Sequence, residues 1–497
     1  MLEREIAARL AEIVGEENLA ADGDASSVGR WRLAAGSPSV GTPRPPGYPA
    51  GSAPRAHPQR AEAVVRPRSA EEVVQVVALA RDRGIAITVR GRGTGLGGGA
   101  VPAKGGIVVS TENLVGPPEI HADDLYVVVG AGMVTRDVRQ AVERAGLFYP
   151  VDPTSEASST VGGNVGEGAS GLRSLKYGST RNYVLGLEVV TGDAKLLRLG
   201  AKTVKNVAGY DLTRLMVGSE GTLGIVTSVT LRVLPLPPDE VMLVLALPEA
   251  RTAAEAAARI MGSGRSPSLL EVADRESLSG IAGDPWSGTG ARLVVGFDGP
   301  RSRCDSEASK VRDLMKSEFG VVPVAEARRP DSERLLEGRR AILAGLLGRP
   351  QGVAGLADLR MQPARLGAMI GRASEIGAAS GARFAVWGHA GQGVLHLAVV
   401  ADEAAREAVA RDRAALAEAA VACGELGGVC RQWLVGEPGG AAAGSTREPA
   451  EGPARGSAGT LAGRLALGES GLDLLRGIKR VIDPKGIMNP GKLDYDI

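Results

Sequence analysis

Residues 89–102 constrain this chain more than any other segment, because six of these fourteen residues are glycine. They follow an apolar run, residues 85–89, that predicts a strand. Glycine concentrates where the backbone must approach a ligand closely or adopt a positive φ. Successive backbone N–H groups in such a loop form a concavity that suits a pyrophosphate. The loop therefore predicts a binding site for a large phosphorylated cofactor.

Residues 93–98 satisfy the G-x-G-x-x-G pattern of dinucleotide-binding Rossmann folds. In that fold a helix follows the loop, and an acidic residue ends a second strand about 20 residues later. Here Ala100-Val101-Pro102 leads to Lys104-Gly105-Gly106, where no helix can begin, and residues 107–110 predict another strand. A glycine-rich loop between two strands argues against the Rossmann fold.

Further motifs occur in a fixed order along the chain: Asp152-Pro153-Thr154-Ser155, and residues 160–165, 175–190, 205–212, 218–226 and 483–492. Together they resemble the vanillyl-alcohol oxidase and p-cresol methylhydroxylase superfamily of FAD enzymes. The nearest branch holds the glycolate oxidase FAD subunit and the D-lactate and D-2-hydroxyglutarate dehydrogenases. The resemblance implies an α+β fold, with a two-lobed FAD-binding domain and an α/β cap domain that has an antiparallel sheet.

FAD is the cofactor that the resemblance implies, with the first loop at the pyrophosphate and the later turns near the isoalloxazine and adenosine. The cofactor-binding residues that it assigns are Arg90, Gly91, Gly93, Thr94, Gly95, Leu96, Gly98, Pro153, Thr154, Gly162, Gly163, Asn164, Gly168, Tyr177, Gly178, Gly218, Glu220, Gly221, Gly224, Ile225 and Asn489. Family members that tether FAD usually carry a histidine in the first loop. Residues 90–102 contain none, so we expect non-covalent binding.

The chain divides by composition and resemblance into five parts. We expect a helix at residues 1–17 and a flexible Pro/Gly-rich arm within residues 1–60, then the FAD-binding domain at 61–237. The cap, or substrate, domain follows at 238–435. Residues 436–463 form a low-complexity insertion predicted to be disordered, and 464–497 a C-terminal helix and tail that return to the FAD domain.

Local signals locate several elements. Ser69 and Glu72 form a capping box that opens a helix ending at Gly84. In the cap we expect strands at residues 241–247 and 293–297, and helices that begin at Arg251 and Ser306. Ordered structure should resume at Leu465, with a final helix through Val481.

The composition limits which partners the protein can bind and in which cellular compartment we expect it. The net charge of +1 gives no sign of a nucleic-acid or anionic-membrane partner. Three cysteines form neither a disulfide framework nor an iron–sulfur or zinc spacing, which predicts a reduced, cytoplasmic protein without a second redox centre. No apolar run is long enough to span a membrane. Electrons must therefore leave through an iron–sulfur partner subunit or a quinone, and any membrane association would come through a partner.

His389 and His396 lie in a segment similar to the family motif H-A-G-D-G-N-L-H, whose histidines bind a metal near the flavin. Imidazoles suit zinc or a similar divalent ion, although two histidines flanking glycines are, taken alone, more often structural. Gln392 and Val394 stand where the family has Asp and Asn. The resemblance implies a site of His389, His396 and Glu425.

The family's next motif, G-E-H-G, supplies that glutamate and a histidine base. Two segments compete for this place: residues 424–427 with Leu426, and residues 436–439 with Pro438. Either alignment keeps a glutamate and loses the base, whose help is worth about 10²–10⁴-fold. We prefer Glu425, because the second segment opens the low-complexity insertion.

Arg339 resembles the cap arginine that binds the substrate carboxylate in the family, although a solvated basic helix face is an equal alternative. With His389 and His396 it completes the predicted catalytic set. Tyr177 and Lys205 either contact flavin or substrate, or serve packing and surface charge.

Two functions are therefore open. One is an FAD-dependent dehydrogenase that oxidises a small 2-hydroxy acid, glycolate or D-lactate, by hydride transfer to flavin. The other is a catalytically weakened FAD subunit that acts in assembly or electron relay in a glycolate oxidase-like complex.

Overall fold

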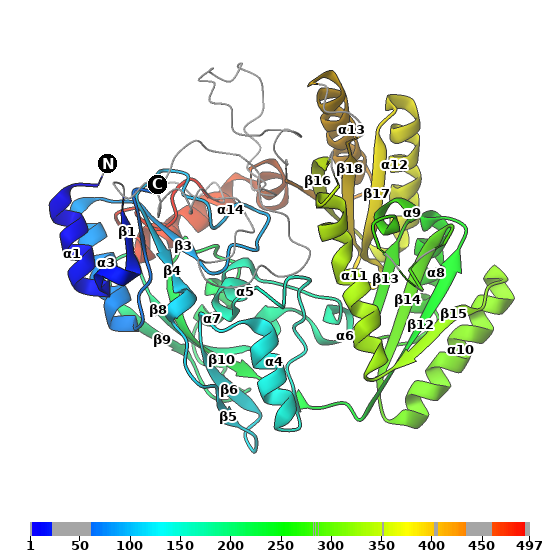
Figure 1. Ribbon diagram of the computed structural model, residues 1–497, viewed down its shortest axis with the longest axis horizontal. Helices are drawn as coiled ribbons and strands as arrows, with labels where there is room; N and C mark the ends of the chain where they lie inside the picture. The colour runs from blue at the N-terminus through cyan, green and yellow to red at the C-terminus, as the bar shows by residue number, and fades with distance from the viewer. Residues whose placement is uncertain are drawn as a thin grey trace.

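The chain folds into a main domain and a cap that lie side by side (Figure 1). The computed structural model describes residues 2–21, 61–281, 283, 285–286, 288–349, 352–401, 406–433 and 460–492. The main domain comprises residues 2–21, 61–237 and 460–492, and the cap comprises the described residues from 238 to 433. Within the described ranges, no helix combines the length and apolar character needed to cross a membrane.

The first lobe of the main domain is built on a four-stranded sheet. Its order is β1 (Leu19–Ala21), β2 (Ala63–Val65), β4 (Ile107–Ser110) and β3 (Ile87–Arg90). β3 runs parallel to β4, a pairing that usually needs a helix in the connection. Here the glycine-rich loop makes the connection instead, which leaves its backbone free at the end of the sheet. Helices α1 (Arg4–Val14) and α3 (Ala70–Arg83) share the core of this lobe.

The second lobe holds an antiparallel sheet of five strands. In sheet order these are β5 (Glu119–His121), β6 (Tyr126–Gly130), β10 (Ile225–Arg232), β8 (Val184–Val190) and β9 (Leu196–Gly200). Burial alternates along β10, as expected for a sheet packed on one face. The short elements of this lobe are α4 (Thr135–Arg144), β7 (Leu147–Phe148), α5 (Val161–Glu167), α6 (Ser174–Tyr177), α7 (Leu212–Met216) and β11 (Leu234–Pro235).

The cap is one antiparallel sheet of eight strands. In sheet order these are β15 (Pro323–Arg328), β12 (Asp239–Leu247), β14 (Ala291–Gly299), β13 (Leu269–Ala273), β17 (Arg383–His389), β18 (Val394–Val400), β16 (Val353–Arg360) and β19 (Val429–Trp433). One face packs on α8 (Ala250–Gly262), α10 (Arg301–Phe319), α12 (Leu366–Ser380) and α13 (Arg406–Glu425). The other packs on α9 (Arg275–Leu278) and α11 (Asp331–Leu347). The predicted α+β class with an antiparallel cap sheet is confirmed.

The C-terminal segment returns to the first lobe. Helix α14 (Thr460–Ile482) is followed by residues that pair with β3, since Asn489 N donates to Ile87 O at 2.6 Å. Lys479 is 3% exposed and donates to Thr222 O at 2.8 Å and Met488 O at 2.7 Å, while it forms an ion pair with buried Asp483. One buried ammonium thus ties the helix, the tail and the turn before β10 together.

Several sequence predictions shift at their ends. α1 stops at Val14 rather than Glu17, because Gly15 adopts φ +86. Ser69 caps α3 as predicted, but Glu72 accepts from Arg68 N at 2.8 Å, so only half of the capping box forms as expected.

Two helices begin earlier than predicted. α10 begins at Arg301, five residues before Ser306, with Pro300 as its N-cap residue. α14 begins at Thr460, five residues before Leu465, so residues 460–463 of the predicted disordered insertion are helical. The rest of that insertion and the predicted arm lie outside the described residues.

Replacement of Lys479 by Met should lower the free energy of unfolding by about 3–5 kcal/mol, because the Asp483 carboxylate would remain buried without its cation. Urea denaturation of the purified protein measures this. The neighbouring exposed cation supplies the control, and Arg480→Met should change stability little. Equal stability of the two variants would show that the buried ammonium does not hold the tail.

Candidate functional site

A cleft in the main domain lies between the glycine-rich loop, helix α5 and the turn before β10. Its wall contains predicted cofactor residues from three separate motifs: Gly91, Gly93, Thr94, Gly95, Gly162, Gly163, Asn164, Glu220, Gly221 and Gly224. The parallel β3–β4 pair carries the first of these motifs, α5 the second and the entry to β10 the third. Segments about 55 to 70 residues apart in sequence therefore form one continuous surface of small residues.

The backbone of the cleft tolerates no larger side chains at several positions. A Cβ atom on Gly91 would collide with the hydroxyl of Thr160, and one on Gly162 would lie 2.7 Å from the Cβ of Ala131. Gly221 has φ +74, and a Cβ there would lie 3.0 Å from Val89. Thr160 is itself fixed, because its hydroxyl caps α5 by accepting from Gly163 N at 3.1 Å. Glycine is thus required both for the turn and for the close approach.

The polar groups beside the loop fit a phosphorylated cofactor. Arg90 is 3% exposed, and burial lowers the pKa of its guanidinium from the ordinary value. The Nε atoms of Arg90 and of neighbouring Arg92 are buried and have no hydrogen-bond partner among the described residues. Guanidinium donors beside a glycine-rich backbone match the oxygens of a pyrophosphate. The residues present therefore fit FAD, whose pyrophosphate Arg90, Arg92 and the loop backbone would hold.

Other predicted cofactor residues support the cleft from behind. Asn489 donates to Gly99 O at 2.8 Å and Glu220 O at 2.5 Å, so the tail joins the first loop to the last turn. Leu96 packs against the cap core, and Ile225 is fully buried. Gly98, Gly168, Gly178 and Gly218 adopt positive φ in turns, and Pro153 and Thr154 precede Ser155, which lines the cleft.

Tyr177 contacts the cap rather than the cleft. Its hydroxyl donates to Asp298 Oδ2 at 2.7 Å, and burial together with that carboxylate raises its pKa. Lys176 forms an ion pair with the same carboxylate. α6 is therefore a contact between the main domain and the cap, which gives Tyr177 a structural partner that the sequence did not predict.

Several residues of the wall were not predicted as site residues, among them Ser155, Thr160 and Glu167. Thr160 had a usable signal, because a threonine directly before an apolar residue is typical of a helix N-cap. Glu167 had no such signal, because a negatively charged carboxylate is not expected beside a loop that binds negatively charged phosphate.

On the cap, the end of β17 places His389 in a buried polar chain. Its Nδ1 lies 2.8 Å from Glu271 Oε1, and Arg339 Nη2 lies 2.8 Å from Glu271 Oε2. All three side chains are at least 90% buried. A carboxylate accepts hydrogen bonds, so Nδ1 of His389 carries the proton in this contact. Glu271 was not predicted, although a lone carboxylate inside the apolar strand β13 marks it.

His396 stands beside His389, with ring centroids 5.5 Å apart and nearly perpendicular planes. Its Nδ1 lies 3.4 Å from Asp358 Oδ1. Burial lowers the pKa of His396, although Asp358 opposes that shift. Burial would raise the pKa of Asp358, but His396 and Arg360 hold it at about 2. The second histidine therefore lies beside a carboxylate of its own, and burial disfavours its charged form.

The predicted metal ligands do not come together. Glu425 is exposed at the end of α13, while each histidine uses Nδ1 for a different carboxylate. Among the residues that the structure describes, no group of three His, Cys, Asp or Glu side chains is arranged to hold a metal ion. The prediction of a site formed by His389, His396 and Glu425 is thus not supported, and the competing Glu437 lies outside the described residues.

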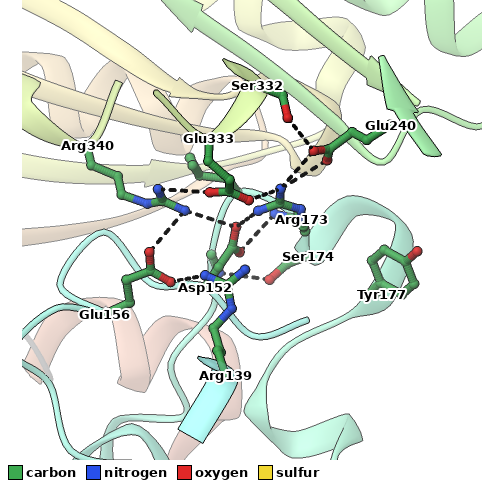
Figure 2. Close-up of polar contacts among 12 residues, drawn as sticks. Arg139, Asp152, Glu156, Arg173, Ser174, Tyr177, Glu240, Ser332, Glu333 and Arg340 are labelled. Carbon is green, nitrogen blue, oxygen red and sulfur yellow. Dashed lines mark hydrogen bonds and ion pairs between the residues drawn. The ribbon is translucent and has the colours of Figure 1, made fainter. Parts of the chain in front are cut away.

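A buried network of charges joins the main domain to the cap (Figure 2). We call it the arginine clasp: Arg139, Asp152, Glu156 and Arg173 of the main domain, and Glu240, Glu333 and Arg340 of the cap. Arg173 is fully buried, with Nη1 2.9 Å from Asp152 Oδ2 and Nη2 3.0 Å from Glu240 Oε1 and 2.7 Å from Glu333 Oε1. Arg173 thus crosses the domain boundary from the main domain, and Arg340 crosses it from the cap.

The clasp lies directly beside the cleft. Asp152 begins the turn that contains Ser155, and its Oδ1 also accepts from Arg173 N at 3.1 Å. Arg340 extends the network from α11, with Nη2 3.3 Å from Glu156 Oε1. Burial opposes the charge of Arg173, but the surrounding carboxylates raise its pKa well above the ordinary value. The same contacts that fix the cap therefore fix one wall of the cleft.

Replacement of Gly91 by Ala should weaken FAD binding by roughly five- to a hundredfold, since overpacking costs about 1–3 kcal/mol. Thr160 cannot turn away without uncapping α5. Titration of the apoprotein with FAD, followed by flavin fluorescence, measures the change. Gly116→Ala is the matched control, because its Cβ would meet nothing within 4 Å. Unchanged affinity in Gly91→Ala would show that FAD does not occupy this cleft.

The clasp should also make stability sensitive to acid. Burial would raise the pKa of Glu333, but Arg173, Arg139 and Arg340 lower it from 4.5 to about 2. A depressed pKa stabilises the folded state above the unfolded value, and that contribution is lost as the pH falls from about 4.5 towards 2. Over this range Glu333→Gln should lose less stability than the wild type.

Urea denaturation at a series of pH values tests this expectation. Glu375→Gln, which changes an exposed carboxylate paired with Arg372, should follow the wild-type profile. Parallel pH profiles for Glu333→Gln and the wild type would contradict the role of Glu333 in the clasp.

Comparison with known proteins identifies both domains. Residues 61–200 match the FAD binding domain family, and residues 236–432 and 462–493 match the C-terminal domain of FAD linked oxidases. The chain is 34% identical to the glycolate oxidase subunit GlcD of Bacillus subtilis over 87% of its length and 88% of the relative. It is also 34% identical to a D-lactate dehydrogenase of Archaeoglobus fulgidus, over 86% of this chain and 90% of the relative.

Solved structures share the fold at low identity. p-Cresol methylhydroxylase superposes with a TM-score of 0.73 at 15% identity, over 99% of this chain and 96% of that one. Alkyldihydroxyacetonephosphate synthase gives a TM-score of 0.71 at 18% identity, over 99% and 86%. From the two domain matches and the relatives, the chain belongs to the FAD-linked oxidoreductases, a family that binds FAD and includes glycolate oxidase subunits and D-lactate dehydrogenases.

Proposed function

We propose that this protein oxidises a small 2-hydroxy acid of the glycolate or D-lactate class to the 2-oxo acid. The observation that carries the proposal is the buried pair of Glu271 on β13 and His389 on β17. β13 lies next to α6 of the main domain. Relatives named as a glycolate oxidase subunit, D-lactate dehydrogenases and a D-2-hydroxyglutarate dehydrogenase support the substrate class.

The pair supplies what the G-E-H-G motif lacks here. Glu271 fixes the tautomer of His389, so Nε2 accepts a proton while Nδ1–H donates to the carboxylate. A carboxylate beside an imidazole also stabilises the cation that forms when the imidazole takes up a proton. His389 therefore serves as the base that removes the substrate hydroxyl proton. FAD, when bound, accepts the hydride from the α-carbon.

Arg339 serves as the cation for the substrate carboxylate. A guanidinium has five N–H donors, and Glu271 engages Nε at 3.0 Å and Nη2 at 2.8 Å. Among the described residues no hydrogen bond engages Nη1, so its donors are left for a substrate oxygen. Because Arg339 and His389 share Glu271, the carboxylate end and the hydroxyl end of a small acid would lie against one buried unit.

The second function, a weakened subunit in assembly or electron relay, is favoured by Leu426 at the family's base position. Under either function the electrons pass on to an iron–sulfur partner subunit or a quinone. The three cysteines are free, which supports a reducing compartment such as the cytoplasm.

Anaerobic mixing of the purified FAD-bound protein with glycolate, D-lactate, L-lactate and D-2-hydroxyglutarate tests the proposal. We expect glycolate or D-lactate to bleach the flavin's visible absorbance. His389→Gln should keep FAD and slow bleaching by about 10²–10⁴-fold, because a general base contributes that much.

His121→Gln is the matched control, since His121 stacks on Tyr126 in the main domain at a centroid distance of 4.3 Å. Full-rate bleaching in His389→Gln would refute the assignment of the base. Failure of every acid to bleach a flavin that dithionite reduces would favour the second function.

A further inference from the structure

One of the sequence motifs has no part in the cleft. Residues 205–212 belong to a stretch, residues 202–212, in which every residue is exposed. Residues 160–165 and 218–226 contribute to the cleft wall, whereas none of residues 205–212 lines it. We call residues 202–212 the apolar loop. It connects β9 to α7 in the second lobe (Figure 1).

Four large apolar side chains of this loop face solvent. The exposed fractions are 67% for Val204, 82% for Val207, 96% for Tyr210 and 43% for Leu212. Single exposed apolar residues are ordinary, but a cluster within one short loop marks a binding surface. The end of the loop is fixed, because Asp211 caps α7 by accepting from Arg214 N at 3.0 Å.

Cations flank these side chains along the chain. Residues 202–214 carry three cations and one carboxylate, so their local net charge is +2: Lys202, Lys205 and Arg214 against Asp211. The whole chain has a net charge of +1, which leaves −1 for the rest. The overall charge, which gave no sign of an anionic partner, therefore conceals a local excess of positive charge.

We propose that the apolar loop binds the surface of a membrane that contains anionic phospholipids. Val204 and Val207 would enter the acyl region, Tyr210 would lie at the interface, and Lys202 and Lys205 would face the headgroups. A lipid surface requires only inserted apolar groups and paired charges. A protein partner requires a matched surface of about 800 Å² on each side, for which one short loop offers little.

The proposal gives the flavin a route to its acceptor, and this consequence rests on the proposed function. α7 is five residues long, about 7.5 Å, and leads from the loop towards the turn at residues 218–221 in the cleft wall. Binding through the loop would bring this side of the cleft close to the bilayer. A quinone dissolved there would then be the electron acceptor.

Co-sedimentation of the FAD-bound protein with vesicles tests the loop without any turnover, so its outcome is independent of the proposed oxidation. We expect binding to phosphatidylcholine vesicles that contain phosphatidylglycerol, and weaker binding in high salt. Joint replacement of Lys202 and Lys205 by Gln should weaken partitioning about 25-fold, since each cation contributes about fivefold. Val207→Asp should abolish it.

Val322→Asp, which changes a valine of the cap that is 60% exposed, should bind as the wild type does. Equal binding of all variants, or no binding of the wild type to these vesicles, would overturn the proposal. So would a change of oligomeric state in Val207→Asp, because a second copy would then cover the loop. A lower unfolding midpoint in Val207→Asp would also contradict the proposal, because it would show that Val207 packs against other residues of this chain.

Discussion

The contact between the cap and the main domain centres on one guanidinium, that of Arg173. A fully buried arginine is unfavourable unless several carboxylates surround it, and Asp152, Glu240 and Glu333 do so from both domains. Removal of one partner would leave a buried charge uncompensated, so the members of the arginine clasp depend on one another. Because Asp152 also begins the turn that lines the cleft, the cap and the cofactor site share a single electrostatic support. Rigid contact, rather than a hinged lid, is the arrangement that such a network favours.

The fold class could be predicted from the sequence because its strongest signals are local. Ser69 and Gly84 mark the ends of α3, and the glycines after β3 report a loop that cannot continue as a helix. Helix ends were less predictable where the deciding residue lacks a distinctive type. α10 begins with Pro300 as its N-cap residue, at which the side chain gives no capping hydrogen bond to predict.

The candidate site also has parts that could be predicted from the sequence and parts that could not. Backbone-lined parts were predictable, because only glycine fits where Gly91 faces Thr160. The polar parts were not, since Glu271 and His389 lie 118 residues apart and meet only through the pairing of β13 with β17. The resemblance to the family located His389 but assigned it to a metal together with Glu425, and the helix that carries Glu425 leaves that carboxylate exposed. Long-range strand pairing decided the chemistry, and no local pattern encodes it.

The bridge that Asn489 makes has a consequence for biosynthesis. The side-chain amide of Asn489 bonds to Gly99 and Glu220, and its backbone pairs with Ile87. Asn489 is about 270 to 400 positions from these three residues in the sequence. Contacts between residues so far apart in sequence form late in folding, because the entropy of a long loop must be lost before the contacts can form. While the ribosome is still making the cap, the glycine-rich loop already exists but has no tail to brace it. The brace between the first loop and the last turn of the cleft can therefore form only after residue 489 has emerged.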